Sequence, residues 1–243
     1  MLLGELIKNI EPAYKSIKFN NIKFNSKDCK TNDIFFSIQG NKLKGNNYIK
    51  DAIKNGSKII ISNLNFEGFN KEKILFIKNK NPRKALADAA SNFYKKKPKN
   101  IIALTGTNGK TSISNFFYQI LSLNKKKVAA IGTLGVLSKK IKLKTNNTTI
   151  DPIKMHQILQ KLKNSNIDNV IIEASSHGLK QHRLDGLNLK TALFTNLTRD
   201  HLDYHKTFKD YLNSKLILFN KLLLNKGNII FENGIPQEKE LNK

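Results

Sequence analysis

Short apolar runs alternate with amphipathic segments along most of the chain, and the two patterns predict strands and helices in turn. Early in the sequence, the runs over residues 33–38 and 57–62 have the length of strands. Residues 46–56 between them are predicted to form a helix that ends at a glycine. A second helix is predicted over 81–97, with a proline in its first turn and lysines at its end. This part is therefore expected to be a small α/β unit.

A charged stretch with a proline, KKKPKN, predicts a domain boundary near residue 97 and domains over 1–97 and 98–243. Strands alternating with helices in the second domain predict a mostly parallel sheet with helices on both faces, which binds ligands at the carboxyl ends of its strands. The polar tail over 232–243 is expected to be frayed. The predicted strands are 100–106, 127–133, 169–176, 192–197 and 228–231, and the predicted helices are 111–124, 152–166 and 208–223.

The segment TGTNGKTS, residues 105–112, runs from a predicted strand through a glycine loop into a predicted helix. Backbone N–H groups and the positive end of the helix dipole converge at such a loop and bind phosphate. Lys110 is expected to reach the terminal phosphates, with the hydroxyl of Thr111 or Ser112 available to Mg²⁺. Leu104 stands where the full pattern has a glycine, so only the short form GTNGKT is present. The alternative is an ordinary strand-to-helix turn.

Two more polar clusters follow predicted strands. Glu173 ends one of them and would supply the hard oxygen ligand that a magnesium nucleotide needs, although acidic residues at strand ends are often mere caps. Adjacent parallel strands would bring it to the sheet edge that holds Lys110. The stretch FTNLTRDHLDYH, residues 194–205, crowds carboxylates and imidazoles and favours a metal or phosphate role. Imidazole is an unusual ligand for Mg²⁺, so spacing alone does not assign His201.

A lysine falls on the apolar face of the helix predicted over 208–223. Lys215 is either at the edge of that face, with its ammonium extended to water, or held inside a site, where burial would lower its pKa and make the amine reactive. The residues of the apolar stripe are Phe208, Tyr211, Leu212, Leu216 and Phe219.

The composition is strongly basic, with 43 Lys+Arg against 18 Asp+Glu and a net charge of +25. That charge suggests a nucleic-acid binder, but the lysines are spread through nearly every segment beside abundant Asn and Ile, as an A+T-rich genome would encode. The aromatic residues do not interleave with the basic runs as a single-strand stacking surface requires. We therefore expect no nucleic-acid partner.

A single cysteine, Cys29, excludes an internal disulfide and fits a reducing compartment. The first residues carry Glu5 and Lys8 where a signal peptide would be apolar, and no run has the length of a membrane span. The chain is expected to be soluble, cytoplasmic, monomeric and without a membrane partner.

Taken together, the motifs resemble the Mur ligases of the MurE type. TGTNGKTS, NNTT, EASSHGLKQHRLDG and FTNLTRDHLDYH match that family in order and spacing, and SSHGLKQHR is specific to this type. The resemblance extends from about residue 20 to 231. It implies a uridine-binding domain over 1–97 and an incomplete ATPase domain over 98–243. By the same resemblance, the family's third domain, which holds the incoming amino acid, is expected to be absent from this sequence.

The resemblance also implies roles for individual residues. The ATP-binding positions are Gly106, Thr107, Asn108, Gly109, Lys110, Thr111 and Ser112. The implied magnesium ligands are Thr111, Glu173, His201 and Lys215, the last as a carbamylated lysine, and the implied catalytic residues are Lys110 and Lys215. The positions that match the muramoyl dipeptide and uridine sites are Ser26, Asn147, Thr148, Thr149, Ser175, Gln181 and Arg183.

The first domain departs from the family pattern. Asn25, Ser26 and Lys27 stand where the family usually has Asp-Ser-Arg, and Asn47 replaces a frequent histidine. Because Lys does not reproduce the planar, bidentate contacts of Arg, the uridine contacts are less well defined than those to ATP.

The implied activity is ATP-dependent amide formation in peptidoglycan precursor synthesis. The third amino acid is added to UDP-N-acetylmuramoyl-L-alanyl-D-glutamate through an acyl phosphate, with ATP and Mg²⁺. It is either meso-diaminopimelate or L-lysine, and family frequency favours meso-diaminopimelate. Because the third domain is absent, the chain alone is expected not to ligate. The alternatives are a noncatalytic remnant that binds UDP-sugar or ATP, a ligase for another muramoyl intermediate, and a nucleic-acid-binding ATPase.

Overall fold

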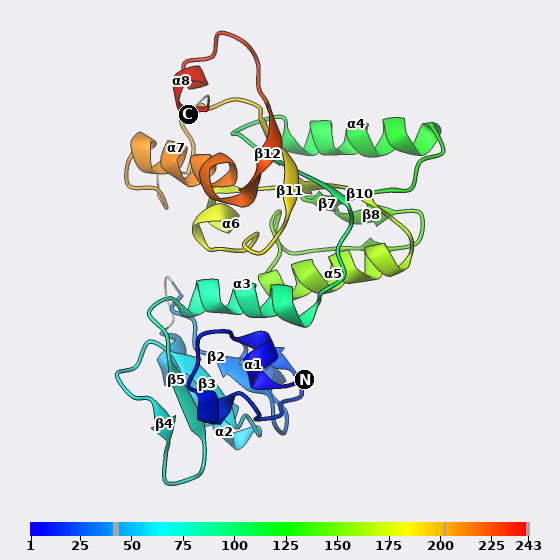
Figure 1. Cartoon of the computed structure of the whole chain (residues 1–243). Helices are drawn as coiled ribbons and strands as arrows, with labels where there is room; N and C mark the ends of the chain where they lie inside the picture. Colours follow the sequence, from blue (N-terminus) through cyan, green and yellow to red (C-terminus); the bar gives the residue numbers. More distant parts are fainter. Residues whose placement is uncertain (41–43, 202, 242–243) are drawn as a thin grey trace. The chain divides into compact units, whose positions relative to one another are not determined.

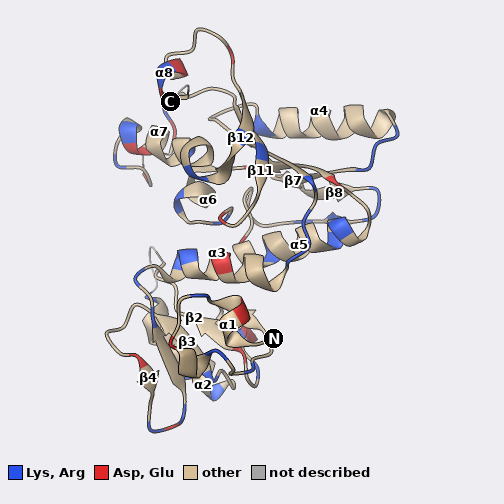
Figure 2. Ribbon diagram, viewed as in Figure 1, with Lys and Arg blue, Asp and Glu red and all other residues tan. Residues whose placement is uncertain are grey.

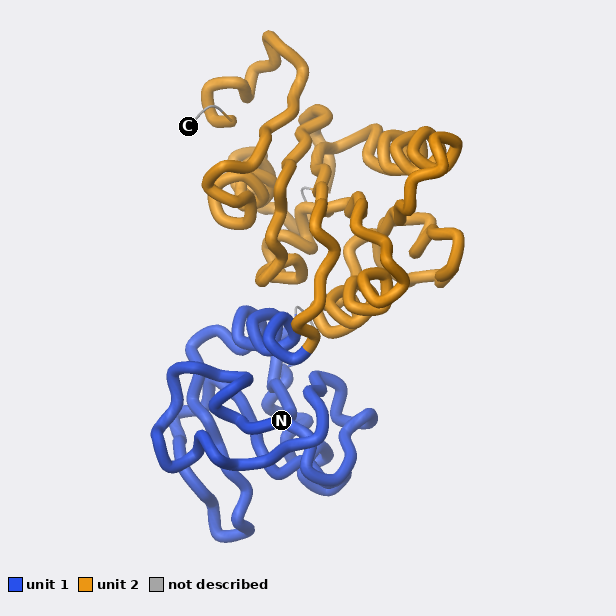
Figure 3. The backbone as a smooth tube through the Cα atoms, turned by 45° about the vertical axis from the view of Figure 1, so that its right-hand side comes forward, with its two compact units in different colours: residues 1–93 blue, residues 94–243 orange. Residues whose placement is uncertain are grey.

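The computed structural model describes residues 1–40, 44–201 and 203–241, which form two compact units (Figures 1 and 3). The units are Met1–Phe93 and Tyr94–Lys243, whereas the charged stretch predicted a boundary near residue 97. Residues of the stretch KKKPKN form hydrogen bonds within the second unit. Lys97 Nζ donates to Gly186 O at 3.0 Å, and Lys99 N donates to Asp168 Oδ1 at 2.9 Å.

The first unit is built on a five-stranded sheet of order β1-β2-β3-β5-β4, in which only β4 runs antiparallel to its neighbour. Its core includes Phe35, Ile60 and Phe76 from three adjacent strands. Its strands are β1 (Ile22–Lys23), β2 (Ile34–Phe36), β3 (Ile59–Ser62), β4 (Gly68–Phe69) and β5 (Leu75–Lys78). Its helices are α1 (Leu3–Leu6), α2 (Ile49–Lys54) and α3 (Pro82–Phe93), with 3-10 turns η1 (Pro12–Tyr14), η2 (Ser26–Asp28) and η3 (Gly45–Tyr48).

The second unit is built on a seven-stranded sheet of order β12-β11-β6-β10-β7-β8-β9. The first five strands of that order are parallel, and β8 and β9 extend the sheet antiparallel. The strands are β6 (Asn100–Thr105), β7 (Val128–Gly132), β8 (Gly135–Ser138), β9 (Lys142–Leu143), β10 (Asn169–Glu173), β11 (Leu189–Phe194) and β12 (Leu223–Ile230). The helices are α4 (Lys110–Leu123), α5 (Pro152–Asn164), α6 (Ser176–Lys180), α7 (Phe208–Ile217) with the π-helical turn η4 (Leu218–Leu222), and α8 (Glu238–Leu241).

Helices α4 and α5 cover opposite faces of this sheet (Figure 1). On β6, Leu104 belongs to the cluster that packs against α4, while Ile101 and Ala103 belong to the cluster with α5. The alternation follows from the two-residue period of a strand. Because both faces are buried, the central strands are continuously apolar, as the sequence predicted for parallel strands.

One prediction for the end of the chain is wrong. The helix predicted over 208–223 is confirmed to within one residue: α7 continues as the π-helical turn η4 to Leu222, and β12 pairs with β11 from Leu223 onward. The tail is not frayed over Glu238–Leu241, since it forms α8 and Leu241, 2% exposed, packs into the core.

Charge is spread over both units, with Lys and Arg on helices and loops throughout (Figure 2). Within the described residues, no helix has the length and hydropathy needed to cross a membrane.

Candidate functional site

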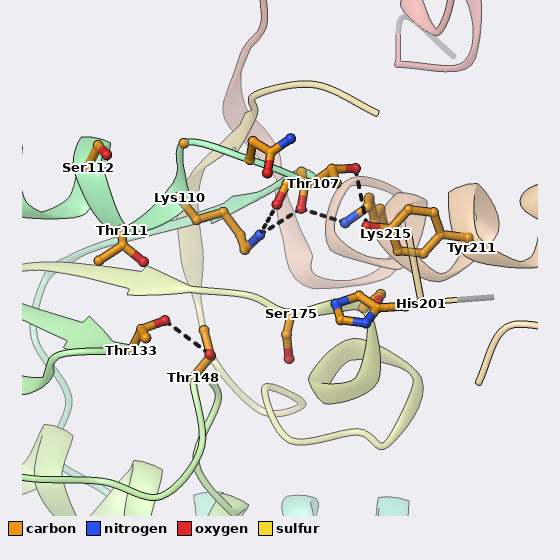
Figure 4. A pocket seen from close by; sticks show the side chains of 14 residues that line it. Thr107, Lys110, Thr111, Ser112, Thr133, Thr148, Ser175, His201, Tyr211 and Lys215 are labelled. Carbon is orange, nitrogen blue, oxygen red and sulfur yellow. Dashed lines mark hydrogen bonds between the residues drawn. The ribbon is translucent and has the colours of Figure 1, made fainter. Parts of the chain in front are cut away.

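A pocket of about 290 Å³ lies at the carboxyl ends of β6, β7 and β10 in the second unit (Figure 4). This is the edge at which a parallel sheet binds ligands. The pairing of β6 with β10 brings Lys110 and Glu173 to that edge, as predicted. The pocket is lined by Gly106, Thr107, Asn108, Gly109, Lys110, Thr111, Ser112, Thr133, Thr148, Ser175, Ser176, His201, Tyr211 and Lys215.

The glycine loop occupies one side of the pocket and leads directly into α4. Gly109 is the N-cap of that helix, with φ of 83°. Gly106 has φ of 149°, and a Cβ built there would collide with the hydroxyl of Thr195, so only glycine fits. Leu104, which replaces the first glycine of the longer pattern, is fully buried against α4. Its position belongs to the core, so the shorter loop needs no glycine there.

A segment after β11 braces this loop. Asn196 accepts hydrogen bonds from two loop amides, through its backbone oxygen from Thr107 N and through Oδ1 from Asn108 N, both at 2.9 Å. Thr195 Oγ1 donates to Asn108 O at 2.7 Å. These bonds occupy the first N–H groups of the loop, so the N–H groups of the first turn of α4 remain for a ligand. The segment FTNLTRDHLDYH was predicted to have a metal or phosphate role, but its pattern gave no role to Asn196.

Two lysines converge on the loop from different elements. Lys110 Nζ donates to Gly106 O at 2.9 Å and to Thr107 O at 2.7 Å, while Lys215 Nζ donates to Gly106 O at 2.6 Å (Figure 4). Burial lowers the pKa of Lys110, and the carboxylates of Glu173 and Asp200 partly oppose that shift.

Lys215 is 1% exposed, so the alternative of an ammonium extended to water is wrong. Burial and the charge of Lys110 lower the pKa of Lys215 to about 7, with Asp200 opposing. Its Nζ lies 4.3 Å from the ring centroid of Tyr211, whose hydroxyl is 3.2 Å from Thr107 Oγ1. The reactive-lysine hypothesis therefore has the burial and the lowered pKa that it requires.

The apolar stripe of α7 is buried except at its start. Tyr211, Leu216 and Phe219 are buried, and Leu212 packs partly against the core. Phe208 is 40% exposed, so its assignment to the buried face is wrong. It occupies the first position of α7, directly after the N-cap, where the helix face has not yet reached the core.

Glu173 lies behind the loop, 1% exposed, and hydroxyl groups surround its carboxylate. Oε2 accepts from Thr111 Oγ1 at 2.9 Å and from Thr133 Oγ1 at 3.1 Å, and Oε1 accepts from Ser114 Oγ at 3.2 Å and from Thr133 N at 3.1 Å. A Cβ on Gly132 would collide with this carboxylate, so the glycine that ends β7 permits the approach.

The oxygens at this point suit a hard divalent cation. Among the described residues, no Lys, Arg or His nitrogen lies within ion-pair distance of Glu173, and its carboxylate is bonded by hydroxyl and amide donors alone. Carboxylate and hydroxyl oxygens are the ligands that Mg²⁺ prefers. No group of three or more His, Cys, Asp and Glu side chains in the described part of the chain is arranged to hold a metal. Lys215, as an ammonium, would repel a cation.

His201 lines the pocket from its rim, with its side chain about half exposed. Its Nε2 lies 3.5 Å from Asp200 Oδ2, and its backbone has φ of 52°. The ring of His177 packs edge-on against it at 5.1 Å between centroids.

The residues expected to bind the muramoyl dipeptide form a connected group beside the pocket. Thr149 Oγ1 accepts from Ser175 N at 2.9 Å, and Thr149 O accepts from Arg183 Nη1 at 2.5 Å. Gln181 Oε1 accepts from Arg183 Nη2 at 2.8 Å. Arg183 has only these neutral acceptors and no carboxylate partner among the described residues, so it is available to an anion.

The remaining predicted positions are not all in the pocket. Thr148 lines it and bonds Thr133 at 3.0 Å between hydroxyls (Figure 4), whereas Asn147 is exposed and outside the lining. Ser26 belongs to the first unit, buried, with its carbonyl accepting from Asn55 Nδ2 at 2.9 Å. Asn47 is exposed in η3, and the preceding residues 41–43 lie outside the described residues.

Comparison with protein families matches both units. The model described as "Mur ligase middle domain" matches residues 104–241, and the one described as "Mur ligase family, catalytic domain" matches residues 18–94.

Curated proteins of similar sequence are longer than this chain. It is 41% identical over 226 residues to the UDP-N-acetylmuramoyl-L-alanyl-D-glutamate--2,6-diaminopimelate ligase of Clostridium tetani, covering 90% of this chain and 47% of that protein. The protein of the same name from Bradyrhizobium diazoefficiens is 39% identical, covering 92% and 46%. The chain spans about half the length of the curated relatives it matches.

Solved structures share the fold. A UDP-N-acetylmuramoyl-L-alanyl-D-glutamate--2,6-diaminopimelate ligase superposes with a TM-score of 0.81 at 25% identity, covering 97% of this chain and 53% of that one. The MurF ligase of Thermotoga maritima in complex with ADP superposes with a TM-score of 0.58 at 18% identity, covering 92% and 48%.

Proposed function

The chain belongs to the Mur ligase family, and we propose that it forms the ATP-binding and muramoyl-dipeptide-binding parts of a ligase that adds meso-diaminopimelate to UDP-N-acetylmuramoyl-L-alanyl-D-glutamate. The names of the curated relatives support this substrate assignment. The observation that carries the proposal is the convergence of Lys110 and Lys215 on Gly106 O, with the carboxylate of Glu173 behind the same loop.

In this proposal the loop and the first turn of α4 bind the phosphates of ATP. In the structure Lys110 Nζ donates hydrogen bonds to two backbone carbonyls, and a phosphate oxygen would replace one of these carbonyls as the acceptor. Mg²⁺, held by Glu173, Thr111 and His201, would supply positive charge to the phosphates. Lys110 would neutralise charge that develops on the transferred phosphoryl group.

Lys215 joins the metal ligands only after modification. With its pKa near 7, a large fraction of its amine is neutral at physiological pH. The neutral amine attacks CO₂, a C–N bond forms, and one proton is released, which leaves a carbamate anion. The repulsive ammonium thereby becomes an oxygen ligand, in agreement with the role that the family resemblance implies.

The dipeptide substrate binds beside the loop. Arg183, with its fork held by Gln181 and Thr149 O, would bind a substrate carboxylate. The D-glutamyl carboxylate oxygen attacks the γ-phosphorus, and ADP leaves as an acyl phosphate forms. The incoming amine then attacks the acyl carbon, and phosphate and a proton leave as the amide bond forms.

The proposal is tested with this chain through ligand binding and through the first half of the reaction, the formation of the acyl phosphate. The chain is titrated calorimetrically with ADP and Mg²⁺ and with the UDP-muramoyl dipeptide, and is then incubated with ATP, Mg²⁺, dipeptide and hydroxylamine, which traps an acyl phosphate as the hydroxamate. We expect both ligands to bind and hydroxamate to form, and Lys110→Ala to abolish its formation. If neither ligand binds, the proposal is wrong.

Two other outcomes favour the competing functions. Binding of both ligands without hydroxamate supports a remnant that binds without chemistry. A salt-sensitive shift of nucleic acid in a gel, with no binding of the dipeptide, supports a nucleic-acid ATPase, which the charge of +25 first suggested.

A further inference from the structure

A buried histidine lies between α6 and α7 and connects two side chains that adjoin the site. His205 is 0% exposed. Its Nε2 lies 2.9 Å from Ser176 Oγ, and its Nδ1 lies 3.3 Å from Ser214 Oγ. Ser176 lines the pocket and follows Ser175, and Ser214 precedes Lys215. The imidazole therefore contacts one residue that lines the pocket, Ser176, and the neighbour of another, Lys215.

The hydrogen bonds around this ring determine which nitrogen carries the proton. Ser214 Oγ donates to Asp210 O at 2.7 Å, so its oxygen accepts from the ring nitrogen that it faces, which is Nδ1 of His205. The Asp210 carboxylate, 3.5 Å from Nδ1, favours the same arrangement. Lys180 holds that carboxylate in place at 2.6 Å. A neutral imidazole protonated at Nδ1 leaves Nε2 as an acceptor.

The proton of Ser176 consequently points inward, to Nε2, and its oxygen offers only lone pairs to the pocket. The hydroxyls of Thr111 and Thr133 also present only their oxygen lone pairs to the pocket, because both donate their protons to Glu173 Oε2. Three hydroxyls of the pocket wall thus act as acceptors toward a ligand. Lone pairs repel phosphate oxygens and attract hydrogen-bond donors.

The donor that fits a phosphate pocket is the water shell of a divalent cation, because Mg²⁺ keeps several of its waters when it binds with a nucleotide. We propose that His205 is a positioning residue whose Nε2 accepts the hydroxyl proton of Ser176, so that this proton is directed away from the pocket. Ser176 Oγ then accepts a hydrogen bond from a water bound to the cation that accompanies the nucleotide phosphates. This inference rests on the proposed nucleotide function of the pocket.

The first test compares nucleotide affinity with and without the cation. The chain and its variants are titrated calorimetrically with ADP, once with Mg²⁺ and once with EDTA. We expect Ser176→Ala to weaken binding about three- to tenfold with Mg²⁺, the effect of one lost hydrogen bond, and to leave binding in EDTA unchanged. An equal loss in EDTA means that Ser176 contacts the phosphates directly, and no loss in Mg²⁺ means that it contacts nothing. Either result overturns the proposal.

Two substitutions of the histidine separate positioning from simple packing. In His205→Gln the side-chain Oε1 takes the place of Nε2 and still accepts from Ser176, while in His205→Asn the amide takes the place of Nδ1 and only the bond to Ser214 remains. We expect the Gln variant to keep most of the Mg²⁺-dependent affinity and the Asn variant to match Ser176→Ala. The double variant of Ser176→Ala and His205→Asn should lose no more than either alone. Equal losses in the Gln and Asn variants, after thermal unfolding has checked that both are folded, contradict the proposal.

The second test needs no nucleotide. In the chain labelled with ¹⁵N-histidine, we expect the ring nitrogens of His205, assigned by their absence in His205→Asn, to show the tautomer protonated at Nδ1. Ser176→Ala should shift mainly the Nε2 resonance. A tautomer protonated at Nε2 overturns the proposal even if ADP binds. Failure of the wild-type chain to bind ADP, with the expected tautomer present, instead contradicts the proposed nucleotide function and with it the role of Ser176 toward the cation.

Discussion

Lys110 and Lys215 donate to the same backbone oxygen, that of Gly106, at 2.9 and 2.6 Å. The two residues come from α4 and α7, more than a hundred positions apart in the chain. Burial lowers the pKa of both amines, and the charge of Lys110 lowers the pKa of Lys215 further. The stability of the folded chain therefore depends on pH.

The first prediction concerns that pH dependence. The pKa of Lys215 falls from 10.5 to about 7 on folding, so between these values the unfolded state binds more protons and stability rises with pH. We expect the free energy of unfolding, measured with urea, to rise between pH 7 and 10 more steeply in the wild type than in Lys215→Met. Lys209→Met, at an exposed position of the same helix, serves as control and should keep the wild-type slope. Parallel slopes for the wild type and Lys215→Met would show that the lysine is not buried as a low-pKa amine.

A second prediction concerns the space at Gly106. In Gly106→Ala the new Cβ meets the hydroxyl of Thr195, and φ of 149° is unfavourable for alanine. We expect the free energy of unfolding to fall by about 1–3 kcal/mol. We also expect ADP binding to become too weak to measure. Gly234→Ala is the matched control, because Gly234 also has a positive φ, 79°, but has nothing within 4 Å of the added Cβ. Equal losses in both variants would mean that the backbone angle alone, and not the contact with Thr195, matters.

Asn196 is predicted to keep the loop in its binding conformation. Asn196→Ala removes the acceptor of Asn108 N and a long hydrogen bond, 3.4 Å, from Asn196 Nδ2 to Asn108 O. The freed amide of Asn108 should exchange its hydrogen faster. We expect ADP affinity to fall about fivefold, the size of effect that the loss of the shorter hydrogen bond produces. Asn124→Ala, which removes a side-chain bond to Ile120 O at the far end of α4, is the control and should leave both readouts unchanged. Unchanged exchange at Asn108 in Asn196→Ala would contradict the bracing role.

The fourth prediction separates the two ligands. Arg183 is held by Gln181 and Thr149 and has no contact with the loop among the bonds described. Arg183→Ala should weaken binding of the UDP-muramoyl dipeptide at least tenfold and leave ADP binding unchanged. Arg183→Lys should recover only part of the loss, because an ammonium cannot form the bidentate contact. A matching loss of ADP affinity would place the arginine with the nucleotide instead.

Local sequence was sufficient for the parts of the site that depend on one strand and one turn. The strand, the glycines and the following helix around Lys110 are specified within a dozen residues. Glu173 was predictable because parallel strands necessarily align their carboxyl ends, and β10 does lie beside β6. The strands of the parallel sheet were predictable for the same reason, since buried strands read as short apolar runs.

Contacts between distant segments were decided only by tertiary packing. The stripe pattern left two possibilities for Lys215, and only the docking of α7 against the loop buried its amine. The sequence assigned no role to Asn196, and it placed His205 only within a cluster of carboxylates and imidazoles that favoured a metal or phosphate role. The hydrogen-bond partners of these two residues lie about ninety and thirty positions away in the chain. Leu241 was assigned to a frayed tail, since one leucine in a polar segment carries no periodic signal. Sequence by itself thus determined which chemical groups stand at the sheet edge, whereas their protonation and orientation follow from burial, which is a property of the folded chain.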